Sequence, residues 1–90
     1  MEREPCELCG RWDYLQKHHV FEGVSLRRKS EQYSEYCTIR ICYRCHDDIH
    51  RHPLKYIGLK QKAQAALMEG LGWTMEEWHI EFGKNYLEGQ

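Results

Sequence analysis

The sequence contains no hydrophobic run that approaches the roughly 18 apolar residues of a membrane-spanning helix. Nor does it open with the apolar core of a secretory signal peptide, because residues 1–5 are mostly charged. These two absences predict a soluble protein of a reducing, cytoplasmic compartment, where disulfides are rare. The five cysteines of the chain therefore need another role.

The chain also lacks the length for a large apolar core. Its 90 residues predict one domain, and a domain of this size is only marginally stable when it relies on buried area alone. A structural metal is one way in which small proteins make up the difference. Metal ligation is thus a natural role for the cysteines.

A strong net charge is the third feature that is missing. The net charge is −1, which by itself argues against a nucleic-acid-binding protein. The charges are segregated, however: residues 17–62 hold ten Lys or Arg against five Asp or Glu, and both flanking segments are acidic. A basic middle region could hold phosphate groups, although an ordinary mixed surface would give the same counts.

Two Cys-x-x-Cys pairs are the clearest motif in the chain. Cys6 and Cys9 form the first pair, followed by Gly10, and Cys42 and Cys45 form the second. With two residues between them, two thiolates can converge on one tetrahedral zinc, and a following glycine permits the positive φ that such turns often need. The two pairs predict a closed, structural four-thiolate zinc site.

A competing site would combine the first cysteine pair with His46 and His50. This site would enclose 36 residues between its halves, whereas zinc fingers enclose about 12–15. It would also leave the second cysteine pair without a role. The four-cysteine site is therefore the better reading of the spacing.

Histidines provide a second group of ligands. His46 and His50 are four residues apart, so on a helix they share one face with Cβ atoms about 5–6 Å apart. Cys45 and His46 are neighbours and are rotated by about 100° on a helix, so one helix can serve two metals. With the adjacent pair His18 and His19 upstream, three imidazoles could bind a divalent ion while a fourth acts as a base. Alone, that pair would be read as surface or hydrogen-bonded histidines.

The order of these motifs resembles that of the His-Asn-His endonucleases. Cys-x-x-Cys is followed by His-His and a hydrophobic residue, and then by Ile-Cys-x-x-Cys-His-x-x-x-His, over roughly residues 6–52. The resemblance implies an α+β fold, with a ββα-metal core in which a hairpin packs on a helix and the zinc knuckles staple the two. Residues 1–53 would form this core and residues 54–90 a helical extension, which is similar to that of small prophage-encoded members.

The resemblance also implies roles for the histidines. His18, His46 and His50 would ligate a catalytic ion, and His19 would be the general base in hydrolysis of DNA phosphodiester bonds, in a bacterial cytoplasm. Histidine suits a base because its imidazole titrates near neutral pH. The substrate would be double-stranded or branched DNA, with RNA not excluded. An all-histidine site fits Zn, Ni, Co or Mn better than Mg.

The chain departs from the family at its middle asparagine, which supports the loop that carries the base. Asn85 is the only asparagine in the sequence, and Cys37 or Thr38 stands at the family's position. This departure keeps open an alternative function, a non-catalytic zinc-binding module for nucleic acid. The acidic, tryptophan-rich C-terminal segment leaves a protein-interaction domain as a third reading.

The remaining elements follow from periodicity and caps. Residues 16–21 and 37–41 are predicted as the two strands of the hairpin, and the polar residues 22–36 between them as a long loop. In a regular strand His18 and His19 point to opposite faces, so a bulge or the strand's end is needed to turn both toward one site. The residues predicted to contact phosphates are Arg27, Arg28, Lys29, Arg40 and Arg44.

Three helices are predicted after the hairpin. The metal-binding helix should end before Pro53, because proline disfavours helix at the residue before it. A second helix is expected from about Leu54 to Glu69. Thr74 and Glu77 form a capping box that should begin a third helix ending near Phe82.

Overall fold

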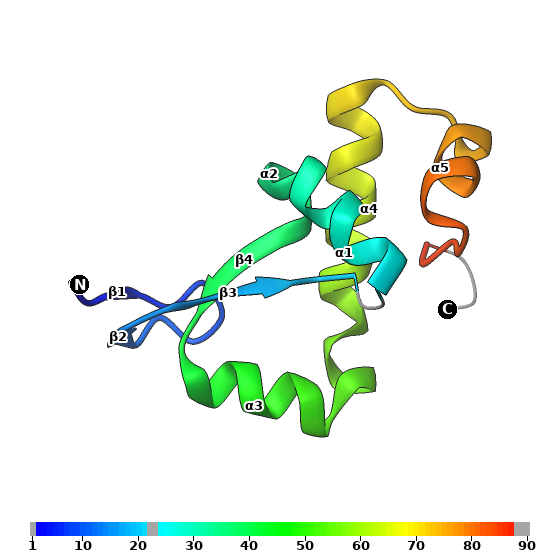
Figure 1. Ribbon diagram of the computed structural model, residues 1–90. Coiled ribbons are helices and arrows are strands. Elements are labelled where there is room, and N and C mark those ends of the chain that lie inside the picture. Colours follow the sequence, from blue (N-terminus) through cyan, green and yellow to red (C-terminus); the bar gives the residue numbers. More distant parts are fainter. Residues whose placement is uncertain (1, 22–23, 88–90) are drawn as a thin grey trace.

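The computed structural model describes residues 2–21 and 24–87, in which short strands and helices are mixed (Figure 1). In chain order the elements are β1 (Glu4–Pro5), β2 (Trp12–Asp13), β3 (Gln16–His19), α1 (Val24–Gln32), α2 (Ser34–Cys37), β4 (Thr38–Ile41), α3 (Tyr43–Arg51), the 3₁₀ helix η1 (Pro53–Tyr56), α4 (Ile57–Leu71) and α5 (Met75–Phe82). The fold is α+β, as predicted. No helix within the described ranges is long and apolar enough to cross a membrane.

Two antiparallel strand pairs organise the N-terminal half. β1 pairs with β2, and β3 pairs with β4 so that His18 lies opposite Ile39 and His19 opposite Thr38. The chain leaves β4 at Ile41 and enters α3 at once. In Figure 1, α3 lies on one side of the β3–β4 pair, and α1 and α2 lie on the other. The two faces of the strand pair are therefore covered by different helices.

The predicted strands are confirmed, but both are shorter than expected. β3 ends at His19 and β4 begins at Thr38. Cys37, expected in the second strand, is the last residue of α2. The predicted alternation of the second strand thus starts one residue later than the sequence suggests.

The predicted long loop at residues 22–36 is wrong in its described part, because α1 and α2 occupy it. Residues 22 and 23 lie outside the described residues. Leu26 and Tyr33 pack against the core and Ser30 is fully buried. These positions have the i, i+4, i+7 spacing of a helix face, but a serine and a tyrosine make that face difficult to recognise from hydrophobicity.

The larger core joins the strand region to the C-terminal helices. Phe21 is its centre, with ring centroids 5.5 Å from Trp78, 5.3 Å from Phe82 and 5.3 Å from Tyr86. The rings of Trp78 and Phe82 stack at 4.2 Å, and the buried indole N–H of Trp78 donates to the carbonyl of Lys84 at 2.8 Å. Aromatic groups of this size dominate the burial energy of a small core. This cluster fixes the end of β3.

A smaller core lies beneath the cysteine pairs. Its buried members are Cys6, Ile41, Cys42 and Ile49, with Leu8, Leu15, Tyr56 and Leu59 among the partly buried residues around it. Few apolar side chains belong to this cluster, so burial alone stabilises it weakly. A metal bound by the cysteines would stabilise this part of the fold, where little apolar surface is buried.

The helix ends agree with most of the predicted boundaries. α3 ends at Arg51, before Pro53, and the carboxylate of Asp48 ties it to η1 by accepting from Tyr56 and Lys55. The predicted second helix is divided into η1 and α4. The side chain of Thr74 accepts from the backbone N–H of Glu77 at 3.2 Å, which confirms the predicted cap of α5.

Candidate metal centres

The four paired cysteines converge on one point. The Sγ atoms of Cys6 and Cys45 are 3.7 Å apart, as are those of Cys9 and Cys42, and all four sulfurs lie within 4.8 Å of one another. Four sulfurs at about 2.3 Å from a tetrahedral zinc would lie about 3.8 Å apart. Disulfide sulfurs are separated by only about 2.05 Å, and all five cysteines are free. This cluster could bind a structural metal such as zinc.

Local backbone geometry holds the sulfurs in place. Gly10 has a φ of 77°, as predicted for the turn after Cys9, and its N–H donates to the carbonyl of Cys6 at 2.9 Å. The sulfur of Cys6 accepts N–H groups of Leu8 and Cys42, each at 3.4 Å. Cys42 is the N-cap residue of α3, so the positive end of the helix dipole favours a thiolate there.

The thiols of this cluster differ in acidity. Burial raises the pKa of Cys6, but N–H groups of Cys9, Cys42 and Leu8 outweigh it and bring that pKa down to about 6. Burial and the neighbouring sulfurs raise the pKa of Cys45. A cluster with one ready thiolate beside a thiol that resists ionisation is suited to a divalent cation, because the cation compensates for the negative charges.

Three histidines, two of them on α3, form a second cluster beside the cysteines. His18 comes from β3, and His46 and His50 come from α3; their ligand nitrogens lie within 4.8 Å of one another. Ring centroids are separated by 5.1 Å (His18 to His46), 5.9 Å (His18 to His50) and 4.8 Å (His46 to His50). His18 is only 4% exposed, whereas His50 lies on the surface. The cluster could hold a metal ion with a position open to solvent, as catalytic sites with three protein ligands do.

A side chain that the sequence analysis missed orients one of these imidazoles. Oε1 of Gln16 accepts from Nδ1 of His46 at 2.6 Å, which leaves Nε2 of His46 for a metal. Burial, followed by the charge of His50, lowers the pKa of His46 and favours the neutral form that binds metal. The available signal was that Gln16 stands two residues before His18, and hence on the same face of the strand.

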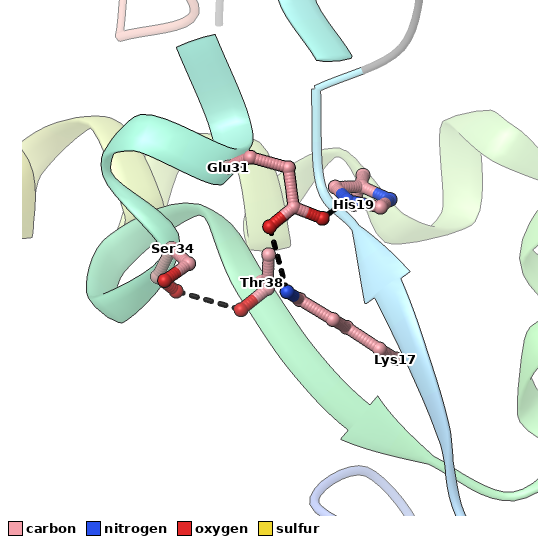
Figure 2. Close-up of polar contacts among 5 residues, drawn as sticks. All are labelled: Lys17, His19, Glu31, Ser34 and Thr38. Atoms are coloured by element: carbon pink, nitrogen blue, oxygen red, sulfur yellow. Dashed lines mark hydrogen bonds and ion pairs between the residues drawn. The ribbon is translucent and has the colours of Figure 1, made fainter. Parts of the chain in front are cut away.

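His19 lies on the other side of β3. The strand register continues without a bulge through His19, so no bulge turns it toward the three-histidine cluster. Its Nε2 is 2.7 Å from Oε1 of Glu31, and the other carboxylate oxygen accepts from Nζ of Lys17 at 2.8 Å. Figure 2 shows the carboxylate between these two side chains. The hydrogen bond from Lys17, followed by that with His19, lowers the pKa of Glu31.

Cys37 and Thr38 are the two candidates for the position at which the endonucleases that the chain resembles have an asparagine, and their surroundings differ. Cys37 is fully buried, and burial raises the pKa of its thiol to about 12. The hydroxyl of Thr38 donates to the carbonyl of Ser34 at 2.6 Å (Figure 2). Because Thr38 pairs with His19 in the sheet, this bond fixes the backbone directly opposite His19.

The residues predicted to contact phosphates have different surroundings. Arg40 forms a double contact with the carboxylate of Glu4, with N···O distances of 2.8 and 3.0 Å, and Lys29 pairs with Glu81. The remaining three are exposed on helices, Arg27 and Arg28 on α1 and Arg44 on α3. The loop that was expected to present the first cluster of cations is therefore a helix.

Comparison of the chain with protein-family models, curated proteins and solved structures finds no match.

Proposed function

We propose that this protein is a metal-dependent endonuclease that hydrolyses phosphodiester bonds of DNA. The observation that carries the proposal is the three-histidine cluster, in which His18 of the strand meets His46 and His50 of the helix, 28 and 32 positions further along the chain. The same residues are those that the resemblance to the His-Asn-His endonucleases assigns to the catalytic ion. In this proposal β3, β4 and α3 are the ββα-metal core, and zinc at the four cysteines staples the strand region to α3.

In this proposal the four histidines have two roles, metal binding and proton transfer. His18, His46 and His50 would hold one divalent ion, which stabilises charge on the phosphorus and on the leaving oxygen when it is bound. His19 would take a proton from the attacking water. β3 has no strand partner on its other edge within the described residues, so we place the scissile phosphate there. Because His18 and His19 point to opposite faces of β3, a phosphate would have to lie at this edge to be reached from both faces.

A non-catalytic zinc-binding module for nucleic acid is the second candidate. One observation favours it: Cys37 or Thr38 stands where the endonucleases that the chain resembles have an asparagine. In such a module the histidines would bind metal or phosphate without cleavage. The two candidates share the zinc site and differ in whether the histidines take part in cleavage.

Cleavage of supercoiled plasmid and of branched DNA separates these candidates. Purified protein would be tested with Mg, Mn, Ni or Zn added, beside His19→Ala and the matched surface variant His52→Ala. We expect nicking that requires a divalent ion, persists in His52→Ala and disappears in His19→Ala, while one tightly bound zinc remains in all three proteins. Absence of cleavage with every ion and both substrates would overturn the nuclease and favour the binding module.

A further inference from the structure

The side of β3 that faces away from the three-histidine cluster carries a second polar group. Lys17 and His19 alternate with Gln16 and His18 along the strand, so they lie on the opposite face. Both contact one carboxylate, that of Glu31 in the last turn of α1. We refer to Lys17, His19 and Glu31 as the β3 outer triad. Its contacts connect a strand that supplies a metal ligand to a helix with no residue in either metal cluster.

The carboxylate of Glu31 is held from two directions. One oxygen contacts Nε2 of His19 at 2.7 Å, and the other accepts from Lys17 at 2.8 Å. The helix that carries Glu31 is itself fixed, because the preceding Ser30 is fully buried and Lys29 pairs with Glu81 of α5. Glu31 is about half exposed (49%), so its contribution to folding is small. Its precise placement has a different consequence.

An ionised carboxylate can only accept hydrogen bonds. Nε2 of a neutral His19 must therefore carry the proton that it shares with Glu31, and the lone pair must lie on Nδ1. This is the arrangement in which a carboxylate fixes the tautomer and orientation of a catalytic imidazole. The chain lacks the asparagine that supports the base in the family that it resembles, and Glu31 comes from a helix that the motif does not include.

We propose that Glu31 is a positioning residue for His19, which it holds in the Nε2–H tautomer so that Nδ1 accepts the proton from water. The proposal rests on the nuclease function for its kinetic part only. Lys17 keeps the carboxylate in place from the other side. Thr38, opposite His19 in the sheet, fixes the neighbouring backbone by its bond to Ser34. The base is thus supported from α1 and from β4.

The tautomer can be measured without any assumption about activity. Long-range ¹H–¹⁵N correlation spectra of zinc-loaded, ¹⁵N-labelled protein distinguish protonated from unprotonated ring nitrogens at a pH where the imidazole is neutral. We expect Nε2 of His19 to be protonated in the parent protein and in Glu35→Gln, a matched loss of charge on the neighbouring helix α2. In Glu31→Ala we expect a mixture of both tautomers. An unchanged Nε2–H tautomer in Glu31→Ala would overturn the proposal.

The kinetic test uses the same variants with plasmid DNA. In Glu31→Ala we expect kcat to fall about ten- to hundredfold, the usual effect of losing a group that orients a functional imidazole, with KM unchanged. Glu35→Gln should cleave like the parent. An unchanged or increased kcat in Glu31→Ala would contradict the positioning role, since an increase would mean that the carboxylate competes with substrate for His19. If no variant cleaves DNA, the nuclease fails while the spectra still decide the role of Glu31.

Discussion

The two candidate metal-ligand clusters share helix α3, where Cys45 and His46 are consecutive residues, yet they are built in different ways. The four cysteines form a closed set, supported by backbone N–H groups and by a small apolar cluster. The three histidines form an incomplete set with one buried and one exposed member, oriented by a side chain, Gln16. A closed set suits structure and an open set suits chemistry. Neighbouring residues of one helix, Cys45 and His46, can therefore serve a structural site and an open site.

The largest expected effect on stability comes from removing one ligand of the closed set, the four cysteines. A structural zinc contributes apparent free energies of about 10–16 kcal/mol, as large as the whole stability of a typical domain. We therefore expect Cys45→Ser to lose zinc and to unfold, as measured by metal content and by circular dichroism. The matched variant Cys37→Ser should keep one zinc and lose about 1–3 kcal/mol, the cost of burying a hydroxyl group without a partner. A folded, metal-free Cys45→Ser protein would contradict the structural role.

Breaking the open set should leave the fold intact. In His50→Ala we expect binding of cobalt to the zinc-loaded protein to weaken by more than about 100-fold, beyond the range for outer partners of a metal ligand. Visible absorption during a cobalt titration measures this, with His52→Ala as the control. Thermal unfolding should be almost unchanged, because His50 is exposed. Equal cobalt affinity in both variants would show that the three histidines do not form one site.

A milder change tests how the open set is oriented. Gln16→Leu removes the acceptor of the Nδ1 proton of His46 while keeping a side chain of similar size. We expect cobalt affinity to fall about tenfold, the lower end of the range for outer partners. The zinc content should stay at one per chain. An affinity equal to that of the parent would mean that α3 alone orients His46.

A further effect, confined to high pH, concerns the fifth cysteine, which belongs to neither set. Its folded pKa is raised to about 12 by burial, above the ordinary value of 9.0. The neutral Cys37 thiol therefore contributes stability that is complete below pH 9 and is lost as the pH rises toward 12. We expect Cys37→Ser to lose less stability than the parent between these limits in denaturant titrations. Identical pH profiles would show that the thiol ionises without hindrance in the folded state.

Sequence patterns were sufficient for the ligands that are close in sequence, because a turn brings together the residues of Cys-x-x-Cys and a helix those of His-x-x-x-His. His18 and the joining of the two cysteine pairs were expected from the order of motifs that resembles the His-Asn-His endonucleases and from the number of ligands that zinc needs. The two clusters contain the cysteines and histidines that the sequence predicts as metal ligands. The partners of those ligands were not predictable in the same way. Gln16 meets His46 across 30 positions and His19 meets Glu31 across 12, so both contacts depend on strand register and helix placement.

The helices between the strands were missed for a physical reason. The inward face of α1 includes Ser30, whose full burial no hydrophobicity scale would predict. The next inward residue is Tyr33, whose ring packs at 5.3 Å from that of Trp73. Trp73 lies 40 positions further along the chain. Tertiary packing, and not local propensity, decides the structure of this segment.

The two cores also differ in when their members become available during synthesis on a ribosome. The cysteine cluster is complete once Cys45 has emerged, about halfway along the chain. The larger core requires Trp78, Phe82 and Tyr86, since all three pack on Phe21. A nascent chain supplied with zinc can therefore close its metal knuckles while Phe21 is still uncovered. The order of translation thus allows the cysteine cluster to assemble before the aromatic core can close.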